Sequence, residues 1–131
     1  MDYIPATENY SAITARFPAG PVAAITPFNF PLNLVAHKVA PSLGIGSTVV
    51  HKPASSTPLT AYLLASIIEE AGIIPGQYNL LNLPGRMAQP MVSHPSIKVV
   101  SFTGSAEVGW NLKREAVDKK VTLELGGNAP A

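Results

Sequence analysis

The sequence predicts an α/β fold in which helices cover both faces of a doubly wound, mostly parallel β-sheet. Short apolar runs of strand length alternate with longer segments of helical pattern along nearly the whole chain. These longer segments are long enough to serve as crossovers between parallel strands. The thirteen prolines and ten glycines fall mainly between the segments, where turns are needed. A chain of 131 residues can bury one core, so we expect one principal domain.

In the first half of the chain, we predict an isolated edge strand and then two strand–helix units. Residues 11–17 alternate, with Ile13, Ala15 and Phe17 on one side, which is typical of a half-buried strand. We therefore assign residues 1–18 to an edge-strand segment of the kind used in oligomerisation. The units that follow are a strand over 22–25, a helix over 32–43, a strand over 48–50 and a helix over 58–71. We expect Pro41 to kink or shorten the first helix and Thr57 to cap the second.

In the second half, three strands are separated by two helices. The strands are expected over 78–82, 97–102 and 121–125, and the helices over 87–93 and 106–118. A parallel sheet binds ligands outside the C-terminal ends of its strands, so the residues after each strand are the candidates for function.

Composition and charge limit the partners of this chain. Hydrophobic residues make up 47% and charged residues only 13%, against roughly 25% charged in typical domains, which excludes a disordered chain. The net charge of +1 gives no patch for nucleic acid or anionic lipid. Residues 17–37 are uncharged, but four prolines prevent a spanning helix there. A chain with so few charges would have an apolar surface, which is typical of part of a larger protein or of a subunit of an oligomer.

The chain has no cysteine, which excludes disulfides, thiolate metal sites and a thiol nucleophile within it. The N-terminus is unlike a signal peptide, which favours the cytoplasm. His37, His51 and His94 show no spacing that suggests a shared metal, so we interpret all three as structural and expect no metal site. Trp110 is interpreted as a packing residue.

Asn29 follows the first buried strand and is the first candidate. It lies between Phe28 and Phe30, and prolines at 27 and 31 hold the segment. Such a rigid amide can donate to an oxyanion or anchor a ligand. It can equally be a turn asparagine that satisfies the local backbone.

Lys52, Ser55 and Ser56 follow the next strand, where dinucleotide folds usually carry an acid that binds the adenosine ribose. No acid is present here, and a lysine with two hydroxyls would accept a ribose 2′-hydroxyl or a 2′-phosphate. The alternative is a solvated lysine near the start of a helix.

Gly104 and Ser105 join a strand to a helix, and such a junction lets a phosphate approach the backbone N–H groups of a helix N-terminus. Gly104 and Gly109 have P-loop spacing, but Trp110 stands where the P-loop lysine is required, so that motif is excluded.

Glu124 lies near the end of the last strand, with Leu125 between it and the glycines at 126 and 127. A carboxylate at the end of an apolar strand is costly to bury in its charged form. It can be a general base or an ion-paired structural glutamate.

Taken in order, these segments resemble the coenzyme-binding domain of the aldehyde dehydrogenase superfamily, from about residue 19 to the C-terminus. The matching stretches are Ile25–Pro31, His37–Pro41, Lys52–Ser55, Glu70–Gly72, Ser101–Ser105 and Leu123–Gly127. The resemblance implies a Rossmann-like fold that is truncated, with residues 19–131 as a partial NAD(P)-binding domain and the catalytic domain absent.

The resemblance also implies roles for individual residues. Asn29 would donate its amide to the oxyanion, and Glu124 would be the general base that activates water. Lys52 and Ser55 would hold the adenosine ribose, Ser105 the pyrophosphate, and Val108 would pack near the adenine. The other residues assigned to coenzyme binding are Thr26, Pro27, Phe28, Gly104, Leu125 and Gly126.

The activity implied is NAD- or NADP-dependent oxidation of a small aldehyde to a carboxylate through a cysteine thioester, in an enzyme that forms a homo-oligomer. Family members place this cysteine in the next domain, so the chain alone is expected to be inactive. Many members that prefer NAD carry an acid at the position of Ser55, which suggests that this one accepts NADP. The alternatives are a non-catalytic dinucleotide-binding module and a structural or assembly fragment.

Overall fold

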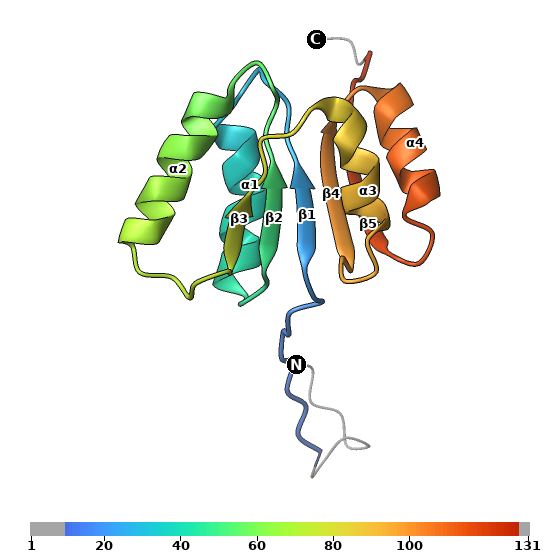
Figure 1. Ribbon diagram of the computed structural model, residues 1–131. Helices are drawn as coiled ribbons and strands as arrows, with labels where there is room; N and C mark the ends of the chain where they lie inside the picture. Colours follow the sequence, from blue (N-terminus) through green and yellow to red (C-terminus); the bar gives the residue numbers. More distant parts are fainter. Residues whose placement is uncertain (1–9, 129–131) are drawn as a thin grey trace.

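The computed structural model describes residues 10–128 and contains one five-stranded sheet in which every pair of neighbours is parallel. The strand order is β3-β2-β1-β4-β5, so β1 is central and β3 and β5 are the edge strands (Figure 1). The strands are β1 (Val22–Ile25), β2 (Val49–Lys52), β3 (Tyr78–Leu80), β4 (Val99–Gly104) and β5 (Lys120–Leu125). This architecture confirms the predicted α/β, doubly wound sheet.

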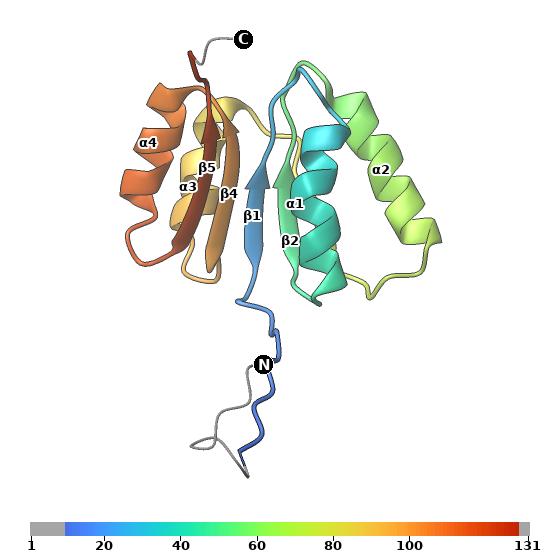
Figure 2. The ribbon, with the colours of Figure 1, turned by 180° about the vertical axis from the view of Figure 1, so that it is seen from behind.

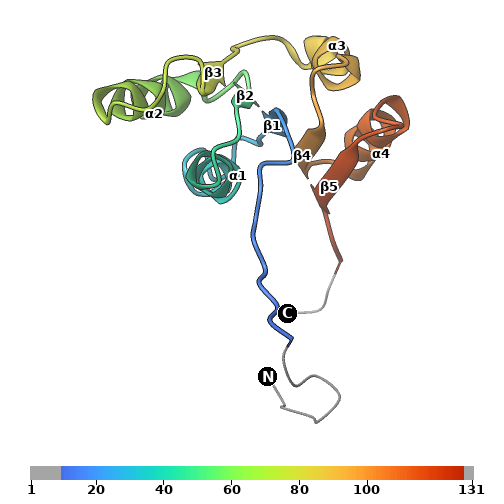
Figure 3. The same cartoon turned by 90° about the horizontal axis from the view of Figure 1, so that it is seen from below.

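The helices lie on both faces of the sheet. α1 (Asn33–Gly44) and α2 (Pro58–Glu70) lie on one face, and Figure 2 shows α1 in front of the sheet when it is viewed from that side. α3 (Ala88–Ser93), which follows the short 3-10 helix η2 (Gly85–Met87), and α4 (Ala106–Glu115) lie on the other face (Figure 3).

Alternation along β1 separates two cores. Ala23 and Ile25 pack into a cluster with side chains of α3, α4 and β4, including Met91, Leu112 and Phe102. Ala24 points to the opposite face, in a smaller cluster made by α1 and β2. The side chains of a strand alternate between faces, so the central strand serves both cores.

The element boundaries differ from the predictions by a few residues, and parts of three local predictions are wrong. Pro41 does not shorten α1, which continues to Gly44, and the kink expected there stays a prediction. The carbonyl of His37 loses its helical partner, but His37 is exposed to water. Thr57 occupies the N-cap position of α2 as predicted, but it makes no side-chain capping bond, and its hydroxyl is buried without a partner among the described residues. Trp110 is half exposed rather than packed, and the Lys113 Nζ lies 5.1 Å from its ring centroid.

The predicted strand over 11–17 is also wrong for this structure, because residues 10–19 have no strand or helix and are almost all exposed. Ile13 is 93% exposed and Phe17 is 81% exposed. A strand needs a neighbour for its backbone hydrogen bonds, and within the described part of the chain no strand pairs with this segment. Figure 1 shows it running away from the N-terminal edge of the sheet. Within residues 10–128, no helix has the length and hydropathy needed to cross a membrane.

Candidate functional site

The site lies where the chain changes direction across the sheet. From β1 the chain continues through α1 to β2 on one side, and from β4 it continues through α4 to β5 on the other. The loops after β1 and β4 diverge here and leave a crevice, which is the usual ligand position in doubly wound sheets. A cleft of about 550 Å³ occupies this position. It is lined by Pro27, Phe28, Asn29, Phe30, Leu34, Thr103, Gly104, Ser105, Glu124, Leu125 and Gly126.

Asn29 and Glu124 line this cleft together, although 95 positions separate them in the sequence. Asn29 lies in the loop after the central strand and Glu124 near the end of an edge strand. An amide that can donate and a carboxylate that can accept a proton therefore face one space. Both are exposed in this chain, so water reaches them.

Thr103 orients the Glu124 carboxylate. The two residues are partners in the register of β4 and β5, and the Thr103 hydroxyl donates to Glu124 Oε2 at 2.9 Å. The expectation that the carboxylate is buried at the strand end is wrong, because the side chain is exposed. The hydrogen bond to a neutral hydroxyl leaves its other oxygen free to face water or a ligand.

Lys38 lies behind the cleft without lining it, and it was not among the predicted site residues. Its side chain is almost buried, and its ammonium donates to the Ser101 hydroxyl at 3.2 Å. Burial lowers the pKa of Lys38, and the negative charge of Glu124 opposes this effect. The helical spacing held a signal, because Lys38 follows Val35 by three residues and so falls on the same buried face.

The glycines after β4 are explained first by packing. A Cβ on Gly104 would lie 2.6 Å from the Phe102 ring, and a Cβ on Gly109 would lie 2.5 Å from Leu125 Cδ2. Ser105 precedes α4 and makes no side-chain capping bond. The first N–H groups of a helix lack partners inside it, so this end of α4 has donors for an anion.

Lys52 and Ser55 do not line the cleft. The Lys52 ammonium is buried and donates to the Pro53 carbonyl at 3.0 Å, and burial lowers the pKa of Lys52. The Ser55 hydroxyl donates to the Leu83 carbonyl at 3.3 Å, which ties the β2 end to the loop after β3. Thr26, 5% exposed, is also absent from the lining.

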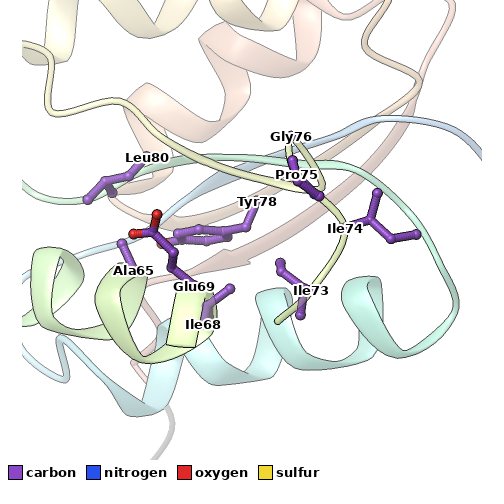
Figure 4. Close-up of a pocket in the computed structure, with 9 residues that line it drawn as sticks. All are labelled: Ala65, Ile68, Glu69, Ile73, Ile74, Pro75, Gly76, Tyr78 and Leu80. Carbon is purple, nitrogen blue, oxygen red and sulfur yellow. The ribbon is translucent and has the colours of Figure 1, made fainter. Parts of the chain in front are cut away.

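Two other hollows lie outside this cleft. Val108 lines a groove of about 270 Å³ between α3 and α4, with Gln89, Asn111, Leu112, Arg114 and Glu115. A hollow of about 440 Å³ lies between α2 and β3, and Figure 4 shows the residues around it, among them Glu69 and Tyr78. None of the predicted site residues lines the hollow between α2 and β3. Among residues 10–128, no group of three or more histidine or acidic side chains could hold a metal ion.

Comparison with known sequences gives one consistent family. The model of the aldehyde dehydrogenase family matches residues 1–131. Retinaldehyde dehydrogenase 3 of Mus musculus is 49% identical over 134 residues, which cover 97% of this chain and 26% of the relative. The 3-sulfolactaldehyde dehydrogenase of Priestia aryabhattai is 44% identical over 130 residues, covering 98% of this chain and 27% of the relative. The chain thus spans about a quarter of the length of these relatives.

Solved structures show the same fold. A glyceraldehyde-3-phosphate dehydrogenase from Methanocaldococcus jannaschii, complexed with NADP, is 47% identical with a TM-score of 0.83, covering 86% of this chain and 26% of that one. An aldehyde dehydrogenase C mutant from Pseudomonas syringae, complexed with NAD⁺ and octanal, is 39% identical with a TM-score of 0.87. That match covers 94% of this chain and 27% of the other.

Proposed function

The chain belongs to the aldehyde dehydrogenase family, and from this premise we propose that it forms the coenzyme-binding part of an enzyme that oxidises a small aldehyde to a carboxylate with NAD or NADP. The observation that carries the proposal is the cleft at the switch point of the sheet, which Asn29 and Glu124 line together. The structures of relatives complexed with NADP or NAD⁺ support the choice of coenzyme.

The residues of the cleft fit a dinucleotide. The N-terminus of α4 offers backbone donors for a pyrophosphate beside Gly104 and Ser105. A Cβ built on Gly126 would meet no atom within 4 Å, so its backbone is open to close approach. In this proposal the adenine enters the groove beside Val108, between α3 and α4, and Pro27 and Phe28 offer apolar surface along the cleft. Bound there, the nicotinamide ring would accept the two electrons and the hydrogen of the aldehyde carbon.

Asn29 and Glu124 have different tasks in this proposal. The Asn29 amide donates to the oxygen of the aldehyde as negative charge develops on it, and removal of such a donor typically lowers kcat about 10²- to 10³-fold. Glu124 removes a proton from the water that attacks the thioester, which releases the carboxylate and returns the thiol. The thiol would come from a cysteine of the polypeptide outside these residues, because this chain has none.

Lys52 and Ser55 are proposed to hold the adenosine ribose. Among residues 10–128, the Lys52 ammonium donates to the Pro53 carbonyl alone, so it retains donors for a ribose hydroxyl or a 2′-phosphate. Ser55 carries no charge, so it would not repel that phosphate as an acid would. We therefore expect NADP to be accepted.

The remaining parts of the proposal are a cytoplasmic location and assembly into a homo-oligomer. Exposed apolar side chains on the outer face of α2, at Leu59, Leu63 and Ile67, support burial against further polypeptide.

Titration calorimetry of the protein with NADP⁺ and NAD⁺ tests the proposal. We expect saturable binding of NADP⁺ with a Kd below about 1 mM and weaker binding after Gly126→Val, which fills the open backbone. Absence of binding of both coenzymes at several times that concentration would contradict it. Strong rejection of NADP⁺ with retained NAD⁺ binding would contradict only the role given to Ser55.

A further inference from the structure

Three polar side chains from three neighbouring strands form a continuous hydrogen-bonded chain beneath α1 and α2. The Nε2 atom of His51 lies 3.0 Å from the Thr26 hydroxyl, and its Nδ1 atom lies 2.7 Å from the Tyr78 hydroxyl. The His51 side chain is fully buried. The chain of bonds therefore runs from the edge strand β3, through β2, to the end of the central strand β1.

The register of the sheet explains how one imidazole reaches both hydroxyls. His51 is opposite Ala24 on β1 and Leu80 on β3. The small Ala24 side chain leaves room for the ring on this face of the sheet. Thr26 lies two residues beyond Ala24 and Tyr78 two residues before Leu80, so both share the face of His51 and lie on its two diagonals.

Burial keeps the imidazole of His51 and the phenol of Tyr78 neutral, and the Thr26 hydroxyl carries no charge. Desolvation, with the nearby charge of Lys52, lowers the pKa of His51 to about 4. Desolvation also raises the pKa of Tyr78 to about 12. At neutral pH the imidazole donates from one nitrogen and accepts at the other, so each hydroxyl finds a complementary partner.

Thr26 connects the hydrogen-bonded side chains to the cleft. Its backbone N–H donates to the Lys52 carbonyl at 3.2 Å, and its side chain is held by His51. The next three residues, Pro27, Phe28 and Asn29, line the cleft, whereas Thr26 itself does not. Any rotation at Thr26 would therefore displace the Asn29 amide.

We propose that His51 is a positioning residue, which holds Thr26 through the hydroxyl and so fixes the segment from Pro27 to Asn29 against the coenzyme. This inference rests on the proposed function, because it assigns a task to the same cleft. The interpretation of His51 as merely structural, drawn from its sequence position, is thereby sharpened: the histidine acts on the site through Thr26.

The test compares the affinities of the protein and its variants for NADP⁺ and NAD⁺. We expect His51→Leu and Thr26→Val each to raise the Kd about ten-fold. The double variant should be no worse than either single variant, because both substitutions remove the same hydrogen bond, the one between His51 and Thr26. Thr26→Ser keeps the hydroxyl and should stay within about two-fold of the unmodified protein. Tyr78→Phe should have a smaller effect, of about three-fold, because the bond to Thr26 remains.

Matched controls separate positioning from general loss of stability. Tyr62→Phe and Thr122→Val remove hydroxyls from an exposed part of α2 and from the exposed face of β5, and should leave the Kd unchanged. Hydrogen exchange at the amides of Phe28, Asn29 and Phe30 should become faster in Thr26→Val but not in Thr26→Ser. The comparison of Thr26→Val with Thr26→Ser keeps the test decisive if His51→Leu fails to fold.

The outcomes distinguish the two proposals. If the unmodified protein binds neither coenzyme, the proposed function is wrong and this inference falls with it. If the unmodified protein binds, but Thr26→Val binds equally well and exchanges at the same rate, this inference alone is overturned. A Thr26→Ser variant as weak as Thr26→Val would overturn it too, because the hydroxyl would then not be the group that matters.

Discussion

The two faces of the sheet are built differently, although the same strands supply both. The face under α3 and α4 is a continuous apolar cluster around Phe102, Val100 and Val92. The face under α1 and α2 has a smaller apolar cluster and buried polar side chains that include His51 and Lys38. His51 is hydrogen-bonded to Thr26 and Tyr78, and Lys38 of α1 is hydrogen-bonded to Ser101 of β4. Apolar packing stabilises without direction, whereas hydrogen bonds fix orientation. The comparison teaches that one face mainly stabilises the sheet and the other mainly orients side chains at its edge.

The largest loss of stability is expected from a substitution on the apolar face. Phe102→Ala should lower the free energy of unfolding by about 3–5 kcal/mol, because it removes the central ring of the cluster and leaves a cavity. Urea unfolding measures this loss. Phe17→Ala is the control, since Phe17 is exposed and its removal should cost less than about 0.5 kcal/mol. Equal losses in the two variants would contradict the assignment of the core.

The next largest effect is a loss of stability in acid, which arises from His51 on the polar face. The pKa of His51 is lowered to about 4 in the folded state, against 6.5 as its ordinary value. Between pH 6.5 and 4 the unfolded chain therefore binds a proton that the folded one refuses, so stability falls as the pH falls. The free energy of unfolding should therefore fall by about 3 kcal/mol by pH 4.

His51→Leu should remove this loss, which urea unfolding at pH 7 and pH 4.5 would show as a smaller difference between the two values. A His51→Leu variant with the full acid sensitivity would show that another group titrates.

A smaller effect tests the close approach of α4 to the apolar face. Gly109→Ala should destabilise by about 1–2 kcal/mol, because the added Cβ would meet Leu125 Cδ2 at 2.5 Å and the Phe102 ring at 3.1 Å, so that both side chains must shift. Gly44→Ala is the matched control, since its Cβ would meet nothing within 4 Å and its backbone is helical. That change should be neutral or stabilising, as calorimetric unfolding would show. The opposite order of the two variants would contradict the packing argument.

The smallest effect tests the second polar contact. Ser101→Ala should destabilise by about 1 kcal/mol, because the nearly buried Lys38 ammonium loses its hydroxyl partner. Ser66→Ala removes an exposed hydroxyl that donates only to the Tyr62 carbonyl in its own helix, and should change little. Urea unfolding compares them, and equal effects would show that the Lys38 contact contributes nothing.

The sequence allowed most of the fold to be predicted, because alternating apolar strands and helices of crossover length have few parallel-sheet solutions. It also placed Asn29 and Glu124 at strand ends, and the structure brings them to one cleft. The strand over 11–17 was wrong because alternation identifies a two-faced segment but not a neighbour to pair with. The contacts of Thr103, Lys38 and His51 could not be predicted, because they join positions distant in sequence.

The position of β5 at the edge of the sheet makes the two ends of the cleft unequal in stiffness. Asn29 follows a strand that is hydrogen-bonded on both sides, whereas Glu124 belongs to a strand that pairs with β4 alone. Edge strands open more readily than central ones. Substitutions along β5 can therefore shift the Glu124 carboxylate while the Asn29 amide across the cleft keeps its place. Under the proposed function, the step that activates water could then vary separately from the step that stabilises the oxyanion.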